Sequence, residues 1–147
     1  MQIAQINVGR VRYPLDDPRM AGFVDNLARV NAIAERSEGF VWRLVGEGDD
    51  ATSIKLTDDP QFIINMSVWA GPEALEAFVY RTVHGRFVQR REDWFEPYPG
   101  PFLALWWVGE GERPTPQEGL RRLRLLEAQG PSSEAFTLAR RFSMPAR

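Results

Sequence analysis

Residues 62–69 of this 147-residue chain read FIINMSVW, a run that is apolar on both sides apart from Asn65 and Ser67. A strand with one face in water alternates apolar and polar residues, whereas a strand covered on both faces is apolar almost throughout. The run therefore predicts a strand that is buried on both faces of a sheet. Residues 102–108, FLALWWV, are apolar in the same continuous way and predict a second strand of this kind.

Alternating patterns on the N-terminal side predict two further strands, over 3–8 and 40–45. Between them, the Asp17-Pro18 pair is typical of a helix start, with an N-cap followed by proline at the first helical position. Apolar residues at helical spacing follow this pair, and Gly39 is typical of a helix end. This half of the chain thus predicts the order strand, helix, strand.

Two more helices are predicted in the rest of the chain. Residues 73–95 carry apolar and aromatic residues at helical spacing, so they predict one amphipathic helix, which the proline-rich segment 97–101 ends. The sequence TPQE at 115–118 is a capping box, and it predicts a helix that stops at Gly130.

The order strand, helix, strand, strand, helix, strand is the ferredoxin-like split βαβ arrangement. It predicts an α+β fold in which two helices cover one face of a four-stranded, mainly antiparallel sheet. The length suits one domain over 1–147, with a core over about 1–110 and an extra C-terminal helical extension over about 115–147.

The second face of this sheet is also expected to be apolar, because the strands over 62–69 and 102–108 are apolar on both sides. An exposed apolar face of roughly several hundred Å² is a liability in a monomer. We therefore favour a homodimer in which two sheets close into an α/β barrel around a twofold axis. Alternatively, residues 120–142 fold back over this face.

Composition excludes several classes of function. The net charge of −2 leaves no basic footprint for nucleic acid. No apolar run is long enough to cross a membrane, and the first residues lack the pattern of a signal peptide, so a cytoplasmic protein is expected. Without cysteine there are no disulfides and no thiolate chemistry, and one histidine alone cannot form a standard structural zinc site. No P-loop and no G-x-S-x-G motif occurs.

The single histidine, His84, lies on the helix predicted over 73–95. Helical spacing places it on one side together with Tyr80, Phe87 and Arg91. Histidine titrates near neutral pH, so His84 is a candidate general acid or base, with Arg91 holding an anionic group and Tyr80 as a secondary donor. Alternatively, His84 only hydrogen-bonds a backbone carbonyl or a carboxylate, and Arg91 pairs with an acid.

Asn7, Arg43 and Asn65 are polar residues in otherwise apolar strands. A buried polar group that lacks a hydrogen-bond partner costs about 1–3 kcal/mol. These side chains are therefore expected either to line a small-molecule site or to form an internal structural network. Trp107 and the other tryptophans are large enough to stack on a planar ligand, although core packing and a dimer interface explain them more economically.

A set of motifs extends over almost the whole chain. By residue number these are 12–16 (RYPLD), 39–43 (GFVWR), 65–69 (NMSVW), 78–81 (FVYR), His84, Arg91, 94–95 (WF), 106–108 (WWV), 130–131 (GP) and 135–137 (AFT). The set resembles the bacterial domain-of-unknown-function family 3291, within the dimeric α/β-barrel superfamily. The resemblance implies the split βαβ fold and the dimeric barrel, and it implies no particular reaction. Such sequences usually have a histidine where this chain has Glu112, which argues against a site built on two histidines.

The superfamily that this resemblance indicates includes cofactor-free oxygenases and haem-dependent enzymes. Our leading hypothesis is a dimeric barrel that binds a small apolar or anionic ligand and, without a cofactor, catalyses a monooxygenase-like oxidation or an isomerase-like rearrangement. In a second hypothesis His84 is the axial ligand of a haem iron. In a third, the protein is a non-catalytic binding or assembly module. The predicted catalytic residues are His84 and Arg91, and the predicted ligand-binding residues are Tyr80, Arg43, Asn65, Asn7, Phe87 and Trp107.

Overall fold

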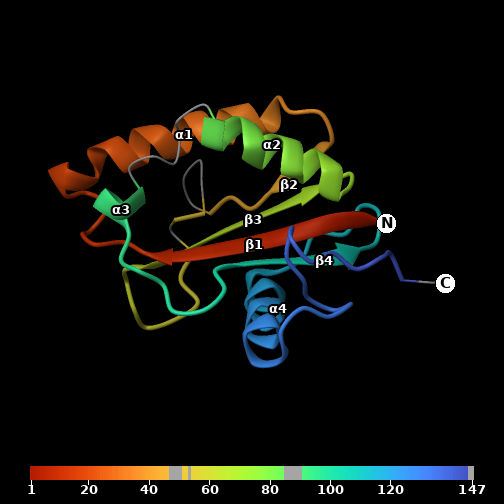
Figure 1. Ribbon diagram of the computed structural model, residues 1–147. Coiled ribbons are helices and arrows are strands. Elements are labelled where there is room, and N and C mark those ends of the chain that lie inside the picture. The colour runs from red at the N-terminus through yellow and green to blue at the C-terminus, as the bar shows by residue number, and fades with distance from the viewer. Residues whose placement is uncertain (47–50, 53, 85–90, 146–147) are drawn as a thin grey trace.

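The chain is built on an antiparallel sheet (Figure 1). The computed structural model describes residues 1–46, 51–52, 54–84 and 91–145, apart from the side chains of Val83, His84 and Arg91. Within these residues the sheet has the strand order β2-β3-β1-β4, and each neighbouring pair is antiparallel. The strands are β1 (Gln2–Arg10), β2 (Phe40–Arg43), β3 (Phe62–Trp69) and β4 (Leu103–Val108). This confirms the predicted ferredoxin-like α+β fold.

The first predicted helix is divided into two parts. Asp17 caps a single 3-10 turn, η1 (Pro18–Met20), and its side-chain oxygen accepts a hydrogen bond from the backbone N–H of Arg19 at 2.9 Å. The α-helix α1 (Ala21–Glu35) follows directly. Asp17 and Pro18 thus mark the start of the helical segment as predicted, although its first turn is 3-10.

The C-terminal helix α4 (Pro116–Gln129) ends just before Gly130, as predicted. The Thr115 hydroxyl accepts a hydrogen bond from the backbone N–H of Glu118 at 3.1 Å, which satisfies one free donor of the first turn. The Glu118 carboxylate instead accepts hydrogen bonds from Arg121 and Arg122, both at 2.8 Å. Only the threonine half of the predicted capping box is therefore formed. None of the described helices is long and apolar enough to span a membrane.

The segment predicted as one helix over 73–95 is helical where the structure describes it, up to Trp94. Its described parts are α2 (Pro72–His84) and α3 (Arg91–Trp94), and residues 85–90 lie outside the described part of the chain. After α3 the backbone pairs with the end of β1, where Val11 and Phe95 form an antiparallel bridge. Tertiary pairing with β1 therefore overrides the helical pattern of the sequence at this point.

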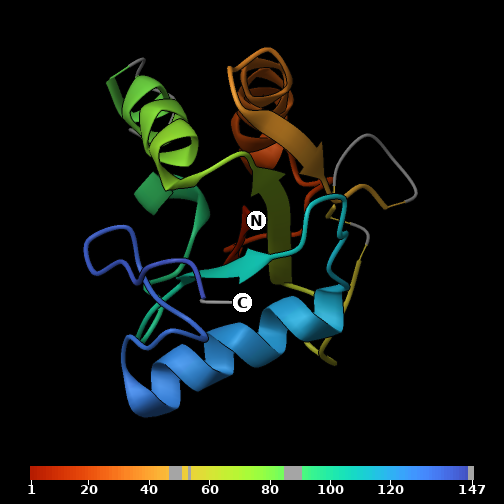
Figure 2. The same cartoon turned by 90° about the vertical axis from the view of Figure 1, so that its right-hand side faces the viewer.

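Helices cover both faces of the sheet (Figures 1 and 2). α1 and α2 lie on one face, and α4 lies on the other. Side chains alternate along a strand, so successive residues of β1 enter different layers. Ile3 joins the cluster that contains Leu75 of α2, whereas Ile6 joins the cluster that contains Leu123 of α4. The core is thus split into two layers by the sheet.

The second face of the sheet is covered within the chain. α4 packs on β4 and β1. Partly buried apolar residues pack on the rest of this face: Val41, Trp42, Leu44, Ile54 and Leu56. Ile6, Met66 and Val68 are fully buried in a single chain as a result. This is the alternative in which the C-terminal segment folds back over the sheet. It covers the β1 and β4 half of the apolar face from which a homodimer was inferred, and the homodimer stays a prediction.

The segment after α4 follows the outer edge of β4. Leu105 and Phe136 exchange backbone hydrogen bonds of 2.8 and 2.9 Å, and the Phe136 side chain is fully buried. The Trp107 indole N–H donates to the backbone oxygen of Phe142 at 2.9 Å. These contacts cover backbone groups that an edge strand would otherwise expose to other chains.

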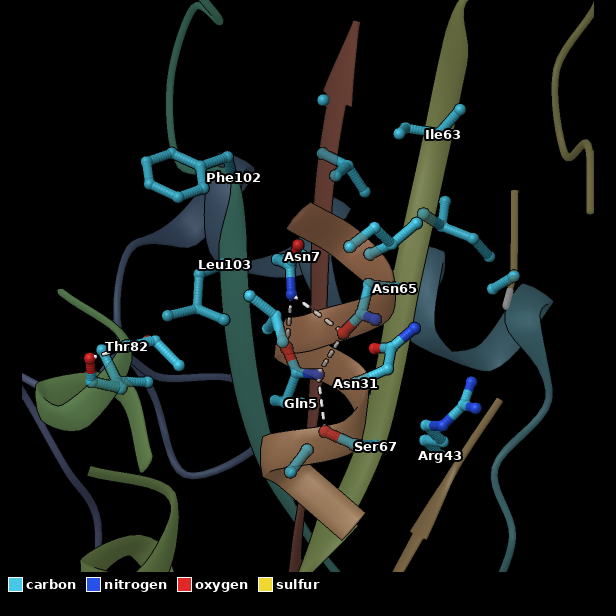
Figure 3. Close-up of a pocket in the computed structure, with 18 of the residues that line it drawn as sticks. Gln5, Asn7, Asn31, Arg43, Ile63, Asn65, Ser67, Thr82, Phe102 and Leu103 are labelled. Carbon is cyan, nitrogen blue, oxygen red and sulfur yellow. Dashed lines mark hydrogen bonds between the residues drawn. The ribbon is translucent and has the colours of Figure 1, made fainter. Parts of the chain in front are cut away.

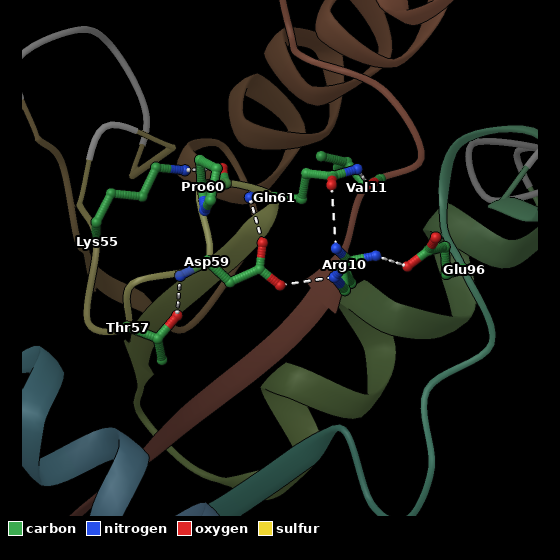
Figure 4. A network of polar contacts seen from close by, with 8 residues as sticks. All are labelled: Arg10, Val11, Lys55, Thr57, Asp59, Pro60, Gln61 and Glu96. Carbon is green, nitrogen blue, oxygen red and sulfur yellow. Dashed lines mark hydrogen bonds and ion pairs between the residues drawn. The ribbon is translucent and has the colours of Figure 1, made fainter.

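A polar network holds the end of β1 (Figure 4). Arg10 pairs with Asp59, Nε to Oδ2 at 2.6 Å, and with Glu96, and it donates to the Gln61 side chain at 3.0 Å. Gln61 in turn donates to the backbone oxygen of Val11 at 2.6 Å. The hydrogen bond from Arg10 lowers the pKa of the Asp59 carboxyl group. The network joins the loop before β3 and the chain after α3 to β1.

Candidate functional site

A cavity of about 300 Å³ lies between the sheet and the helices α1 and α2 (Figure 3). Its volume is at the lower end of the range for small-molecule sites, roughly 300–1,000 Å³. Most of the described side chains that line it are apolar. Those on the two helices and on β4 include Leu27, Val30, Leu75, Phe78, Val79 and Leu103. Four of the polar lining residues lie on β1 and β3, and the others lie on α1, α2, β2 and at position 52.

Four polar side chains on β1 and β3 form a hydrogen-bonded chain, which we call the amide network: Gln5, Asn7, Asn65 and Ser67. Asn7 Nδ2 donates to Gln5 Oε1 at 3.0 Å and to Asn65 Oδ1 at 3.2 Å. Gln5 Nε2 donates to Asn65 Oδ1 at 3.0 Å and to Ser67 Oγ at 2.7 Å. Strand register explains the network, because Gln5 lies opposite Ser67 and Asn7 lies opposite Asn65.

Trp69 fixes one end of the amide network. Its indole N–H, which can only donate, is bonded to Ser67 Oγ at 2.9 Å. The Trp69 ring is fully buried and stacks on Phe78 of α2, with ring centroids 5.0 Å apart. The network is therefore held in position by the packing of the core.

Asn31 of α1 faces the cavity beside Asn65 (Figure 3). The residue is 7% exposed, and its side chain has no hydrogen-bond partner among the described residues. Two atoms of the amide network, Asn65 Nδ2 and Asn7 Oδ1, also have no partner in the part of the chain that the structure describes. Donors and acceptors from α1, β1 and β3 thus converge on the cavity without being satisfied there.

Arg43 of β2 is the one ionisable residue among the described residues that line the cavity. Its side chain is 14% exposed, and Nε is buried without a hydrogen-bond partner. Nη2 lies 3.6 Å from Oε1 of Glu35, the last residue of α1, which is beyond ordinary hydrogen-bond distance. The Glu35 side chain is itself 52% exposed. Arg43 therefore brings a loosely paired positive charge to the cavity wall.

Phe95 closes one end of the cavity against Gly9. A Cβ atom on Gly9 would lie 2.5 Å from Phe95 Cε1, so the glycine lets the ring approach the strand this closely. Phe23 of α1 meets Phe95 edge to face, with ring centroids 5.2 Å apart. Backbone hydrogen bonds of 2.8 and 2.9 Å tie residues 94–96 to residues 10–12. The position of the Phe95 ring thus depends on the pairing of this segment with β1.

Three of the predicted ligand-binding residues, Asn7, Arg43 and Asn65, meet in the cavity. His84 is the last residue of α2 and Arg91 is the first residue of α3, but their side chains lie outside the described part of the structure, as does Phe87 entirely.

Tyr80 and Trp107 are not among the described residues that line the cavity. Tyr80 is 64% exposed. The buried side of α2 is formed by positions such as Leu75 and Thr82, and Tyr80 lies on another side of the helix. The Trp107 indole is bonded to the C-terminal segment instead.

Gln5, Ser67 and Asn31 were not among the predicted site residues. Gln5 and Ser67 are each two residues from a predicted site residue on the same strand, so the period of a strand places them on the same face as Asn7 and Asn65. Asn31 interrupts the apolar side of α1. A polar residue within an apolar helical stripe was the signal available for it in the sequence.

The antiparallel sheet and the two helices that pack above the cavity make this chain a ferredoxin-like α+β protein. The chain belongs to the family of the domain of unknown function DUF3291, which it matches over residues 2–147. No curated protein matches the chain.

Two solved proteins share this fold. The structure of SnoaB, a cofactor-independent oxygenase from Streptomyces nogalater, is 16% identical with a TM-score of 0.53, and the match covers 78% of this chain and 97% of that one. A structure of an asparagine-to-alanine mutant of the same oxygenase matches with a TM-score of 0.52. NE2512, a protein of unknown function from Nitrosomonas europaea, is 12% identical with a TM-score of 0.52, over 78% of this chain and 95% of that one. At these identities the likeness concerns the fold.

Proposed function

We propose that the cavity binds a small, planar, mostly apolar molecule that carries a hydrogen-bonding oxygen. The observation that carries this proposal is Asn31, a residue that is 7% exposed, lines the cavity beside the amide network and has no side-chain hydrogen-bond partner among the described residues. A ligand oxygen between Asn31 and Asn65 would accept from the unused N–H groups of both side chains.

The walls of the cavity favour a planar ligand. Trp69, Phe78, Trp94 and Phe95 present aromatic rings among the lining residues. Flat rings pack on one another in offset-stacked or edge-to-face arrangements, which contribute beyond the burial of apolar area. A ring system would therefore use these walls better than a flexible chain does.

We further propose that the ligand is a substrate, which the protein oxygenates or isomerises without a cofactor. Amide N–H groups directed at one oxygen stabilise negative charge that develops on it, as in an enolate or a phenolate. Such an anion is electron-rich, and this is what a direct reaction with dioxygen or a proton shift requires of a substrate. The description of one structural neighbour as a cofactor-independent oxygenase agrees with this direction.

A proton transfer in this reaction needs a group that titrates near neutral pH. None of the described lining residues is of such a type. His84 lies two residues beyond Thr82, which lines the cavity, and we propose His84 as the acid or base. Arg91 remains our candidate for holding an anionic group. Both proposals rest on the places of these residues along the chain.

The haem hypothesis gains no support from the described residues. Haem iron takes histidine, cysteine, methionine or tyrosine as its protein ligand. None of these residue types lines the cavity in the part of the chain that the structure describes.

Calorimetric titration with 2-naphthol tests the binding proposal. We expect saturable binding to the wild type and affinity about tenfold weaker in Asn31→Leu, which removes one hydrogen-bond partner of the ligand. Ala32→Leu changes a neighbouring exposed residue of α1 and serves as the control. Absence of binding by the wild type would overturn the proposal.

Oxygen consumption by the complex tests the reaction. Uptake of dioxygen that depends on both protein and ligand supports an oxygenase, and a changed ligand without uptake supports an isomerase. Binding without oxygen uptake and without a change in the ligand supports the third hypothesis, a non-catalytic binding module.

We also propose a homodimer that uses the half of the second sheet face next to β2. Support comes from Val41, Trp42 and Leu44, which are only partly buried there, whereas α4 packs on the β4 and β1 half. Light scattering on the purified protein gives its mass directly. We expect a dimer that Trp42→Glu converts to a monomer, and a monomeric wild type would contradict the proposal.

A further inference from the structure

We propose that the ligand of this cavity carries a carboxylate and that Arg43 binds it, which makes the substrate class a planar aromatic carboxylic acid. This inference rests on the proposed function and adds the charge of the ligand to it. The amide network would then hold a second oxygen of the same molecule, on the neighbouring strands.

The first observation is that the Arg43 guanidinium is poorly satisfied. Its Nε is buried without a hydrogen-bond partner, and none of its N–H groups forms a hydrogen bond to a described residue. A guanidinium has five N–H donors in a fixed planar arrangement. A cation that is largely removed from water and not hydrogen-bonded is unfavourable, because it has lost solvation without replacement. An anion in the cavity would supply acceptors to the Nη1 and Nη2 groups of the guanidinium.

The second observation is that Glu35 is an incomplete partner for Arg43. The shortest separation between them is 3.6 Å, and the Glu35 side chain is 52% exposed. An exposed pair at this separation interacts weakly, because water screens it. Glu35 therefore balances part of the charge and leaves the guanidinium free to form a closer pair.

The third observation concerns which anion fits. Arg43 alone supplies positive charge among the described lining residues, and the other lining groups are neutral amides, hydroxyls and apolar side chains. The planar fork of Arg43 can pair with two oxygens of a carboxylate or of a phosphate, but its single positive charge balances a carboxylate and not a phosphate dianion. The aromatic side chains among the lining residues suit the ring of an aromatic acid.

Calorimetric titration with 2-naphthoate and 2-naphthamide tests the inference, because the two probes share a ring system and differ in charge. We expect the wild type to bind 2-naphthoate about tenfold more tightly, as a charge-assisted hydrogen-bonded pair allows. Arg43→Gln should remove this preference. Arg29→Gln removes one positive charge from an exposed position of α1, and this variant should keep the preference for 2-naphthoate.

Two more variants separate ligand binding from a structural role of Arg43. Glu35→Gln removes the competing carboxylate, so affinity for 2-naphthoate should rise by about two- to fivefold. Arg43→Lys keeps the charge but not the planar fork, and it should retain only part of the preference. Binding of neutral 2-naphthol shows whether Arg43→Gln is folded, and we expect it to be unchanged.

The inference and the proposed function fail in different ways. Equal binding of both probes by the wild type, or a preference that survives in Arg43→Gln, overturns the carboxylate site and leaves a neutral ligand for the cavity. A preference lost equally in Arg29→Gln also overturns it, since long-range charge then explains the effect. If 2-naphthoate, 2-naphthamide and 2-naphthol all fail to bind, the proposed function is wrong and the inference falls with it.

Discussion

Asn7 donates a side-chain hydrogen bond of 3.2 Å to Asn65, and the same two residues are backbone register partners in β1 and β3. The Asn65 oxygen also accepts from Gln5 at 3.0 Å. One side-chain oxygen therefore joins two amides of the neighbouring strand. This arrangement leaves the N–H₂ group of Asn65 available on the cavity side.

Replacement of Asn65 by leucine should destabilise the protein. Gln5 and Asn7 each lose an acceptor in Asn65→Leu, so the free energy of unfolding should fall by about 1–3 kcal/mol. Urea unfolding followed by tryptophan fluorescence measures the change. An unchanged free energy of unfolding would show that the amide network does not stabilise the sheet.

The same replacement at Asn31 should not destabilise the protein. Asn31 has no side-chain hydrogen-bond partner to lose among the described residues, and leucine adds an apolar side chain to an apolar cavity wall. We expect the free energy of unfolding of Asn31→Leu to equal or exceed that of the wild type, while ligand binding weakens. Urea unfolding of Asn31→Leu and Asn65→Leu under the same conditions compares their free energies of unfolding. A loss of more than about 1 kcal/mol would mean that Asn31 has a structural role.

The Phe95 ring should not tolerate a methyl group on Gly9. In Gly9→Ala the new Cβ would lie 2.5 Å from Phe95 Cε1 and 2.6 Å from Cδ1, so the ring has to move. Overpacking of this kind costs about 1–3 kcal/mol. Thermal unfolding should show the loss, and Phe95→Leu in the same chain should recover part of it. Additive losses in the double variant would contradict a direct contact between the two positions.

The strands and α4 were predictable because their signals are local. The run over 62–69 is apolar on both sides, and the structure buries it between helices on both faces. The threonine cap and Gly130 fix the bounds of α4 without help from the rest of the chain. Local signals of this kind do not say what covers a sheet face. The sequence pattern therefore did not reveal that α4 covers the β1 and β4 part of the face for which a second subunit was predicted.

The candidate site was predictable in part. Asn7, Arg43 and Asn65 are visible as polar breaks in apolar strands, and they meet because antiparallel register brings strands distant in sequence together. The helical pattern over 73–95 does not reveal that residues 94–96 pair with β1. Phe95 therefore reaches the cavity, while Tyr80 remains exposed.

Glu118 should make the stability of the protein depend on pH below about 4.5. Hydrogen bonds from Arg121 and then Arg122 lower the pKa of this carboxyl group from 4.5 to about 2. A carboxyl group whose pKa is lowered by folding stabilises the protein above its unfolded pKa, and this contribution is lost as the pH falls toward the folded value. The difference in melting temperature between the wild type and Glu118→Gln should thus be constant from pH 8 to about 5 and shrink between about 4.5 and 2.

Arg122→Gln tests whether the pairing of Glu118 with arginine causes this pH dependence. Arg122 Nε donates to Glu118 at 2.8 Å and is one of the two arginines that hold the carboxylate. In an Arg122→Gln background the effect of Glu118→Gln at pH 7 should be smaller, because one charge-assisted hydrogen bond is already gone. If Glu118→Gln lowers the melting temperature equally in both backgrounds and at every pH, the pairing of Glu118 with the arginines does not stabilise α4.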